Sequence, residues 1–82
     1  MSRTFQQNIS GIDVWITIDE AFRHNDNREL EVFGNLVYFK FEPPALVYGE
    51  LIRGEDGVPV TVEDDQEAID LVTEVINERY AA

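Results

Sequence analysis

The spacing of apolar residues changes once along this chain, and that change constrains the fold more than any other feature of the sequence. Between Ile12 and Ile18, isoleucine and valine occupy every second position, which is typical of a strand with one buried face. From about Asp64 to Tyr80, apolar residues recur every three or four positions, which is typical of an amphipathic helix. Strands followed by a single helix indicate an α+β fold.

The first predicted hairpin turns at Ser10-Gly11. A two-residue loop at this position keeps most apolar partners on one face of the sheet. The expected pairs are Phe5 with Ile16, Gln7 with Val14 and Ile9 with Ile12.

The second predicted hairpin turns at Gly34-Asn35, because both residue types tolerate the positive φ angles of a two-residue turn. Counting outward from this turn places apolar pairs on one face, and on the other it sets one pair of opposite charges across the strands. The expected pairs are Val32 with Val37, Leu30 with Phe39, Glu29 with Lys40 and Glu31 with Tyr38.

The third predicted hairpin joins residues 46–53 to residues 58–62 through the segment 54–57, which is rich in turn-forming residues. This pairing places Leu51 beside Val60. Pro59 has no amide hydrogen to donate, so we expect the last strand at an edge of the sheet. Gly49 is interpreted as a bulge position.

The predicted helix begins with Asp64 and Glu67, which together match a capping box: a carboxylate accepts hydrogen bonds from the free amides of the first turn. At ~100° per residue, the apolar side chains fall within an arc of roughly 140°. They are Ala68, Ile69, Val72, Val75, Ile76 and Tyr80. Carboxylates gather on the opposite side, so one face of the helix packs and the other faces water.

The sheet that these hairpins predict is wider than the helix. Six strands at ~4.8 Å spacing span about 29 Å, whereas one helix is ~10 to 12 Å across. Either the sheet curls around the helix as a half-barrel, or a second subunit supplies the missing cover. We expect one domain over residues 1–82, with a strongly curved antiparallel sheet of five to six strands and one C-terminal helix on one face. A homodimer stays an open alternative.

The charge of the chain excludes two classes of partner. There are 17 acidic and 6 basic residues, which give a net charge of -11, and 11 of those acids lie within residues 42–82. Nucleic acids and anionic membranes repel such a chain, so we expect no direct binding to either. The sequence contains no cysteine and no secretory signal at its start, which favours a cytoplasmic location.

The sequence offers little for catalysis or metal binding. His24 is the single histidine, so a site with several histidines cannot form, and we interpret it as a solvated loop residue. Carboxylates are abundant, but no segment has the alternating oxygen ligands and the glycine of a calcium loop. We expect no enzymatic activity, no cofactor and no metal.

Two sets of residues are candidates for binding a protein. The aromatic set is Trp15 and Tyr38, which the strand pattern places at outward positions, where aromatic residues anchor interfaces. The alternative for this pair is burial in a sheet that is packed on both sides. The acidic set suits a basic partner, and its alternative is a solvated surface that only provides solubility. This set is Glu63, Asp64, Glu67, Asp70, Glu74 and Glu78.

These observations favour a small acidic protein-binding module. We expect its partner to be a basic, nucleic-acid-handling protein, which the module inhibits as an immunity protein or antagonist that imitates the charge of nucleic acid. The main alternative is a structural or regulatory homo-oligomer that uses the uncovered sheet face as its interface. An enzyme or a small-molecule carrier is a third alternative, although so small a core leaves little room for a cavity.

Overall fold

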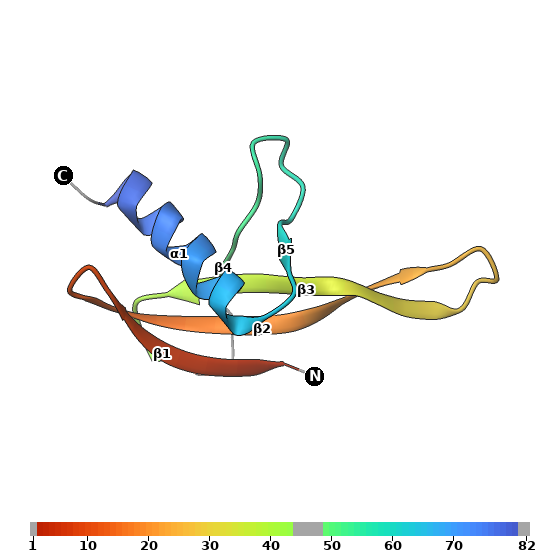
Figure 1. Cartoon of the computed structure of the whole chain (residues 1–82), viewed down its shortest axis with the longest axis horizontal. Helices are drawn as coiled ribbons and strands as arrows, with labels where there is room; N and C mark the ends of the chain where they lie inside the picture. Colours follow the sequence, from red (N-terminus) through yellow and green to blue (C-terminus); the bar gives the residue numbers. More distant parts are fainter. Residues whose placement is uncertain (1, 44–48, 81–82) are drawn as a thin grey trace.

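The computed structural model describes residues 2–43 and 49–80. Five strands precede one helix, as the change in apolar spacing predicts (Figure 1). The elements are β1 (Arg3–Ile9), β2 (Ile12–His24), β3 (Leu30–Lys40), β4 (Glu50–Leu51), β5 (Thr61–Val62) and α1 (Asp65–Arg79). The α+β class, the antiparallel sheet and the C-terminal helix are confirmed.

The strands form one open sheet. β1 pairs with β2 and β2 pairs with β3, while the short strands β4 and β5 both pair with β3. β4 lies opposite Tyr38 and Phe39, and β5 lies opposite Asn35 and Leu36. The sheet therefore ends at β1 on one side and at β4 and β5 on the other, without closing.

The first hairpin forms as the sequence predicts. Ser10 and Gly11 both have positive φ angles, 54° and 84°, as a two-residue turn of this kind requires. β1 and β2 pair in the expected register, with Phe5 opposite Ile16, and the hydroxyls of Thr4 and Thr17 share a 2.9 Å hydrogen bond across the strands. The residues of the turn and the alternation of apolar residues favour the same register, so the pairing of β1 with β2 could be predicted from the sequence.

β2 and β3 form one long hairpin with its turn at Asn25, so the predicted turn at Gly34-Asn35 is wrong. Asn25 holds the observed turn, because its Oδ1 accepts hydrogen bonds from the backbone amides of Asn27 (2.9 Å) and Glu29 (3.0 Å). β3 continues through Gly34 without turning. The pairs predicted between its two halves therefore do not form, and both halves pair with β2.

Gly34 and Asn35 serve the contact between β3 and β5. A Cβ atom added to Gly34 would lie 2.8 Å from the Cβ of Thr61, so the absence of a side chain lets β5 approach. The side-chain amide of Asn35 donates a hydrogen bond to the backbone oxygen of Val62 (3.2 Å). The close approach of β5 to β3 therefore explains why Gly34 and Asn35, residue types typical of turns, occupy these positions in a strand.

A bulge divides the long hairpin. Ala21 lies opposite Gly34, whereas the next residue, Phe22, lies opposite Val32. Phe33 is thus the extra residue of β3, and it reverses the alternation of side chains along that strand. As a consequence, Val32 lies on the same face of the sheet as Val37, and this is the face that packs against the core.

The third hairpin has the predicted loop but a different register. The amide of Gly54 donates to the backbone oxygen of Val58 (2.9 Å), which closes the loop. Arg53 then lies opposite Pro59, which sets Val60 opposite Ile52, so the predicted pairing of Leu51 with Val60 is wrong by one position. Residues 46–48 of this predicted hairpin lie outside the described residues.

Gly49 marks a second close approach to β3. A Cβ atom added to this residue would lie 2.1 Å from the backbone oxygen of Phe39. The glycine that we interpreted from the sequence as a bulge position therefore permits backbone contact beside β4.

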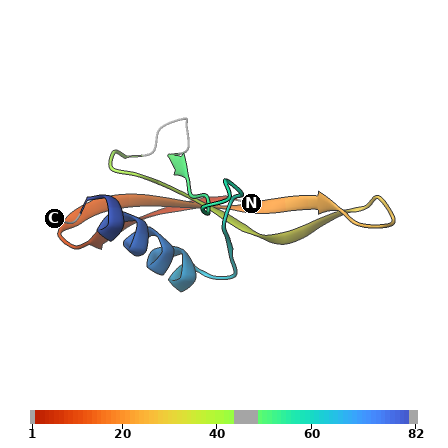
Figure 2. The same cartoon turned by 90° about the horizontal axis from the view of Figure 1, so that it is seen from above.

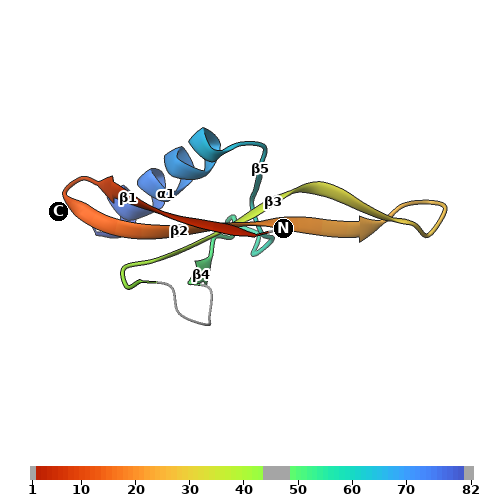
Figure 3. The ribbon, with the colours of Figure 1, turned by 90° about the horizontal axis from the view of Figure 1, so that it is seen from below.

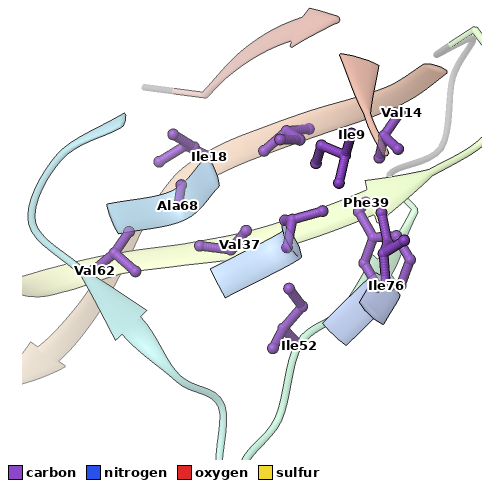
Figure 4. Close-up of a cluster of buried hydrophobic side chains, with 11 residues drawn as sticks. Ile9, Val14, Ile18, Val37, Phe39, Ile52, Val62, Ala68 and Ile76 are labelled. Atoms are coloured by element: carbon purple, nitrogen blue, oxygen red, sulfur yellow. The ribbon is translucent and has the colours of Figure 1, made fainter. Parts of the chain in front are cut away.

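α1 lies on one face of the sheet, and its N-terminus forms as predicted. Asp64 is the N-cap, and its Oδ1 accepts a hydrogen bond from the amide of Glu67 (2.9 Å). The buried core lies between this helix, the sheet and the segments that flank the third hairpin (Figure 4). Its members are Ile9, Val14, Ile16, Ile18, Val37, Phe39, Ile52, Val62, Ala68, Val72 and Ile76. Tyr80, which we expected on the packed face, ends the helix and is half exposed.

The far end of the β2–β3 hairpin extends beyond the helix as a two-stranded ribbon (Figures 2 and 3). We call residues 22–33 the arm. The molecule measures 48 × 28 × 20 Å, and its radius of gyration is 13.6 Å. A compact domain of this length has a radius of gyration of about 12 Å. The arm accounts for the elongation, because the core lies entirely at the other end.

Candidate protein-binding surfaces

The six predicted carboxylates form one exposed surface at the start and along the outer side of α1, and we call them the acidic surface. All six residues are exposed. They are Glu63, Asp64, Glu67, Asp70, Glu74 and Glu78. The helix that presents the last four of them is anchored to the sheet, because Ala68, Val72 and Ile76 on its opposite side are buried in the core.

Two of these carboxylates are engaged in capping the helix. Asp64 accepts from the amide of Glu67, and the Glu67 Oε2 atom accepts in turn from the amide of Glu63 (3.1 Å). This reciprocal pattern satisfies amides that the helix leaves free. The charges stay exposed, but the positions of these two side chains are set by the fold.

The other helix carboxylates follow one stripe. Asp70, Glu74 and Glu78 succeed each other every four residues, so they lie about 6 Å apart along the helix axis. Asp70 accepts a hydrogen bond from the side-chain amide of Gln66 (3.0 Å). Like charges at this spacing repel each other, which costs a few tenths of a kcal/mol per pair. The stripe is thus a surface that an opposite charge would stabilise.

Nearby arginines do not neutralise the acidic surface. Arg3 pairs with Asp65, and Arg79 pairs with Glu50, whose hydrogen bond and charge raise the pKa of the Arg79 guanidinium. Arg53 donates instead to the backbone oxygen of Gly57 (2.9 Å). Within residues 2–43 and 49–80, none of the six carboxylates forms an ion pair.

A groove of about 250 Å³ runs between α1 and the third hairpin, beside the stripe. Its lining combines apolar side chains with three carboxylates and one arginine. The apolar members are Ile52, Val60, Leu71 and Val75, the acidic members are Glu55, Glu74 and Glu78, and Arg53 and Gly54 complete the lining. Lysine and arginine carry a long apolar stem and a charged head, which match such a groove.

The aromatic candidates lie on the other face of the sheet. Trp15 and Tyr38 alternate with the core residues Ile16, Val37 and Phe39, so they point away from α1. Both are half-buried. The structure therefore does not bring them together with the acidic surface, and a partner on the helix would not reach them.

The arm carries an apolar face that sequence reasoning missed. Phe22, Leu30 and Val32 lie on one face, and they are 55%, 66% and 48% exposed. On the opposite face, Arg23 pairs with Glu31 (2.9 Å) and stacks over the ring of Phe33. The sequence shows an alternation of apolar and charged residues at positions 30–32, but the incorrect turn at Gly34 assigns Leu30 and Val32 to the core.

No family model, curated protein or solved structure matches this chain. In the described segments, no three His, Asp or Glu side chains converge on a point where they could hold a metal ion, and His24 is exposed, with Nδ1 3.3 Å from the backbone oxygen of Arg28. No helix among the same residues has the length and apolar character needed to cross a membrane.

Proposed function

We propose that this chain is a small protein-binding module that presents its acidic surface to a basic protein. The partner class is a nucleic-acid-handling protein, such as a nuclease, and the module acts as its inhibitor or antagonist in the cytoplasm. One observation supports this proposal above the others. Six exposed carboxylates lie on one rigid helix and its cap, while the neighbouring arginines are engaged with other groups.

Electrostatics explain why this surface suits such a partner. An unneutralised patch of one sign attracts the opposite sign over long range and raises association rates, and this attraction weakens with salt. Proteins that bind nucleic acid carry the complementary basic surface. The groove beside the stripe adds a place where the stem of a partner's lysine or arginine contacts Leu71 and Val75 while its head meets Glu74 and Glu78.

The test is a pull-down from a cell lysate with two matched baits. The first bait carries Asp70→Lys, Glu74→Lys and Glu78→Lys, which reverses the stripe without touching the capping carboxylates. The second, Asp26→Lys, Glu29→Lys and Glu42→Lys, changes the net charge equally at exposed positions outside α1 and its cap. We expect the wild type and the second bait to retain a basic protein that elutes with salt, and the first bait to lose it.

A second step identifies the partner class. The captured protein, identified by mass spectrometry and purified, should bind the wild-type chain in competition with duplex DNA, because both ligands would occupy one basic surface. Equal capture by both baits would exclude the stripe as the contact. Simultaneous binding of DNA and this chain would exclude the imitation of nucleic acid.

A further inference from the structure

The arm lacks the support that the rest of the sheet receives. β1 pairs with β2 only as far as Ile18, and β5 pairs with β3 only as far as Asn35. Among the described residues, the arm therefore consists of two strands with no further strand on either side. A two-stranded ribbon is marginally stable in water by itself and needs packing on one face.

The apolar face of the arm continues the core face of the sheet. Ile16, Ile18, Glu20 and Phe22 follow one another along β2 at intervals of two, and the bulge places Val32 and Leu30 beside Phe22 from β3. Glu20 and its cross-strand partner Asn35 separate the core from the apolar residues of the arm. These three side chains are more exposed than the core by a wide margin, since every core member is at most 5% exposed. Three large apolar side chains that lie together and stay exposed are typical of an interface.

We propose that this apolar face packs against the same face of a second copy of the chain, which gives a symmetric dimer joined arm to arm. Charge favours this occupant over a basic protein. The arm contains three acids and two arginines, a net charge of -1, while the remaining residues carry -10 of the total of -11. Two copies that meet through their arms bring together the least negative part of each and keep the acidic surfaces apart.

The exposed area agrees with a small dimer interface. With ~150 to 200 Å² for each large side chain, Phe22, Leu30 and Val32 expose roughly 300 Å² per copy. Apolar atoms form about 57% of a typical interface, so two arms would bury about 1,000 Å² in total. That value lies at the lower limit for a specific interface, which predicts a dimer that dissociates on dilution.

The dimer does not depend on the proposed binding of a basic partner. The arm and α1 lie at different ends of the molecule, and the interface is apolar (Figure 1). Arm-to-arm association is therefore expected to persist in molar salt, whereas a complex on the acidic surface would dissociate. This difference separates a failure of one proposal from a failure of the other.

Sedimentation velocity over a concentration series tests the dimer with two matched variants. Leu30→Glu and Tyr80→Glu each replace an exposed apolar residue, 66% and 50% exposed, by a negative charge. Leu30 lies on the arm, whereas Tyr80 ends α1 at the other end of the molecule. We expect Leu30→Glu to raise the dissociation constant at least ~100-fold, because both copies lose an apolar contact and gain a charge, and Tyr80→Glu to leave it unchanged.

Single cysteines give a second measurement, since the chain contains no cysteine of its own. Val32→Cys should form a disulfide between copies under mild oxidation, and Tyr80→Cys at equal concentration should not. A wild-type chain that stays monomeric at millimolar concentration would overturn the proposal. Equal weakening by Leu30→Glu and Tyr80→Glu, or equal cross-linking of both cysteine variants, would also overturn it.

Discussion

Replacing Gly34 by alanine tests the contact between β3 and β5 directly. The glycines with positive φ in the described chain are Gly11 and Gly57, so alanine can adopt the backbone conformation of Gly34. The cost arises from space instead. The added methyl group would lie 2.8 Å from the Cβ of Thr61, which belongs to a paired strand and cannot rotate away.

The expected destabilisation is about 2 kcal/mol, since an extra methyl group in a tight contact typically costs 1–3 kcal/mol. A domain of this length has a stability of roughly 4–12 kcal/mol, so the variant should still fold. For a domain of this size, 2 kcal/mol corresponds to a decrease in melting temperature of roughly 10 °C. Urea unfolding followed through the fluorescence of Trp15, the single tryptophan, measures the free energy of unfolding of the wild type and of Gly34→Ala.

A double-mutant cycle with Thr61→Gly separates two explanations for the cost. If the clash is the cause, removing the Thr61 side chain should recover at least 1 kcal/mol of the loss from Gly34→Ala, beyond the independent cost of Thr61→Gly. If Gly34 lay in a turn with positive φ, as the sequence suggests, the two changes would be additive. Additivity within 0.3–0.5 kcal/mol, or no loss from Gly34→Ala alone, would refute the reasoning.

Two further substitutions test the helix and its packing. Asp64→Ala should lower the free energy of unfolding by about 1 kcal/mol because it removes the hydrogen bond to the Glu67 amide, while Asp64→Asn should retain most of it; equal losses would contradict a capping role. Ile76 is 1% exposed, so Ile76→Ala should lower the free energy of unfolding by about 2–5 kcal/mol and Ile76→Val by about 1 kcal/mol. An Ile76→Ala variant with unchanged stability in urea unfolding would contradict the observed core.

The sequence predicted those parts of the fold that short segments determine. The Ser10-Gly11 turn and the alternation around Ile16 act over fewer than ten residues, and both specify the same register. The helix from Asp64 was predicted for the same reason, because its cap and its period of 3.6 are local. The exposure of the acidic stripe followed from that period.

The long hairpin could not be predicted in this way, because its explanation lies far away in the sequence. A side chain at position 34 would clash with Thr61, which lies 27 residues later in the sequence. Asn35 likewise contacts Val62, 27 residues later. Sequence patterns near Gly34 cannot distinguish a turn from a close approach. The same error hid the arm, because it folded Leu30 back onto Phe39.

The helix is too small to cover the sheet, as the sequence predicts, but the mismatch lies in the length of the strands rather than in the width of the sheet. β2 has 13 residues and α1 has 15. At their different rises per residue, the strand is about 43 Å long and the helix only about 22 Å. Even a helix aligned with the strand would therefore leave roughly half of β2 uncovered. The sheet stays open, and the uncovered half is the arm with its exposed Phe22, Leu30 and Val32.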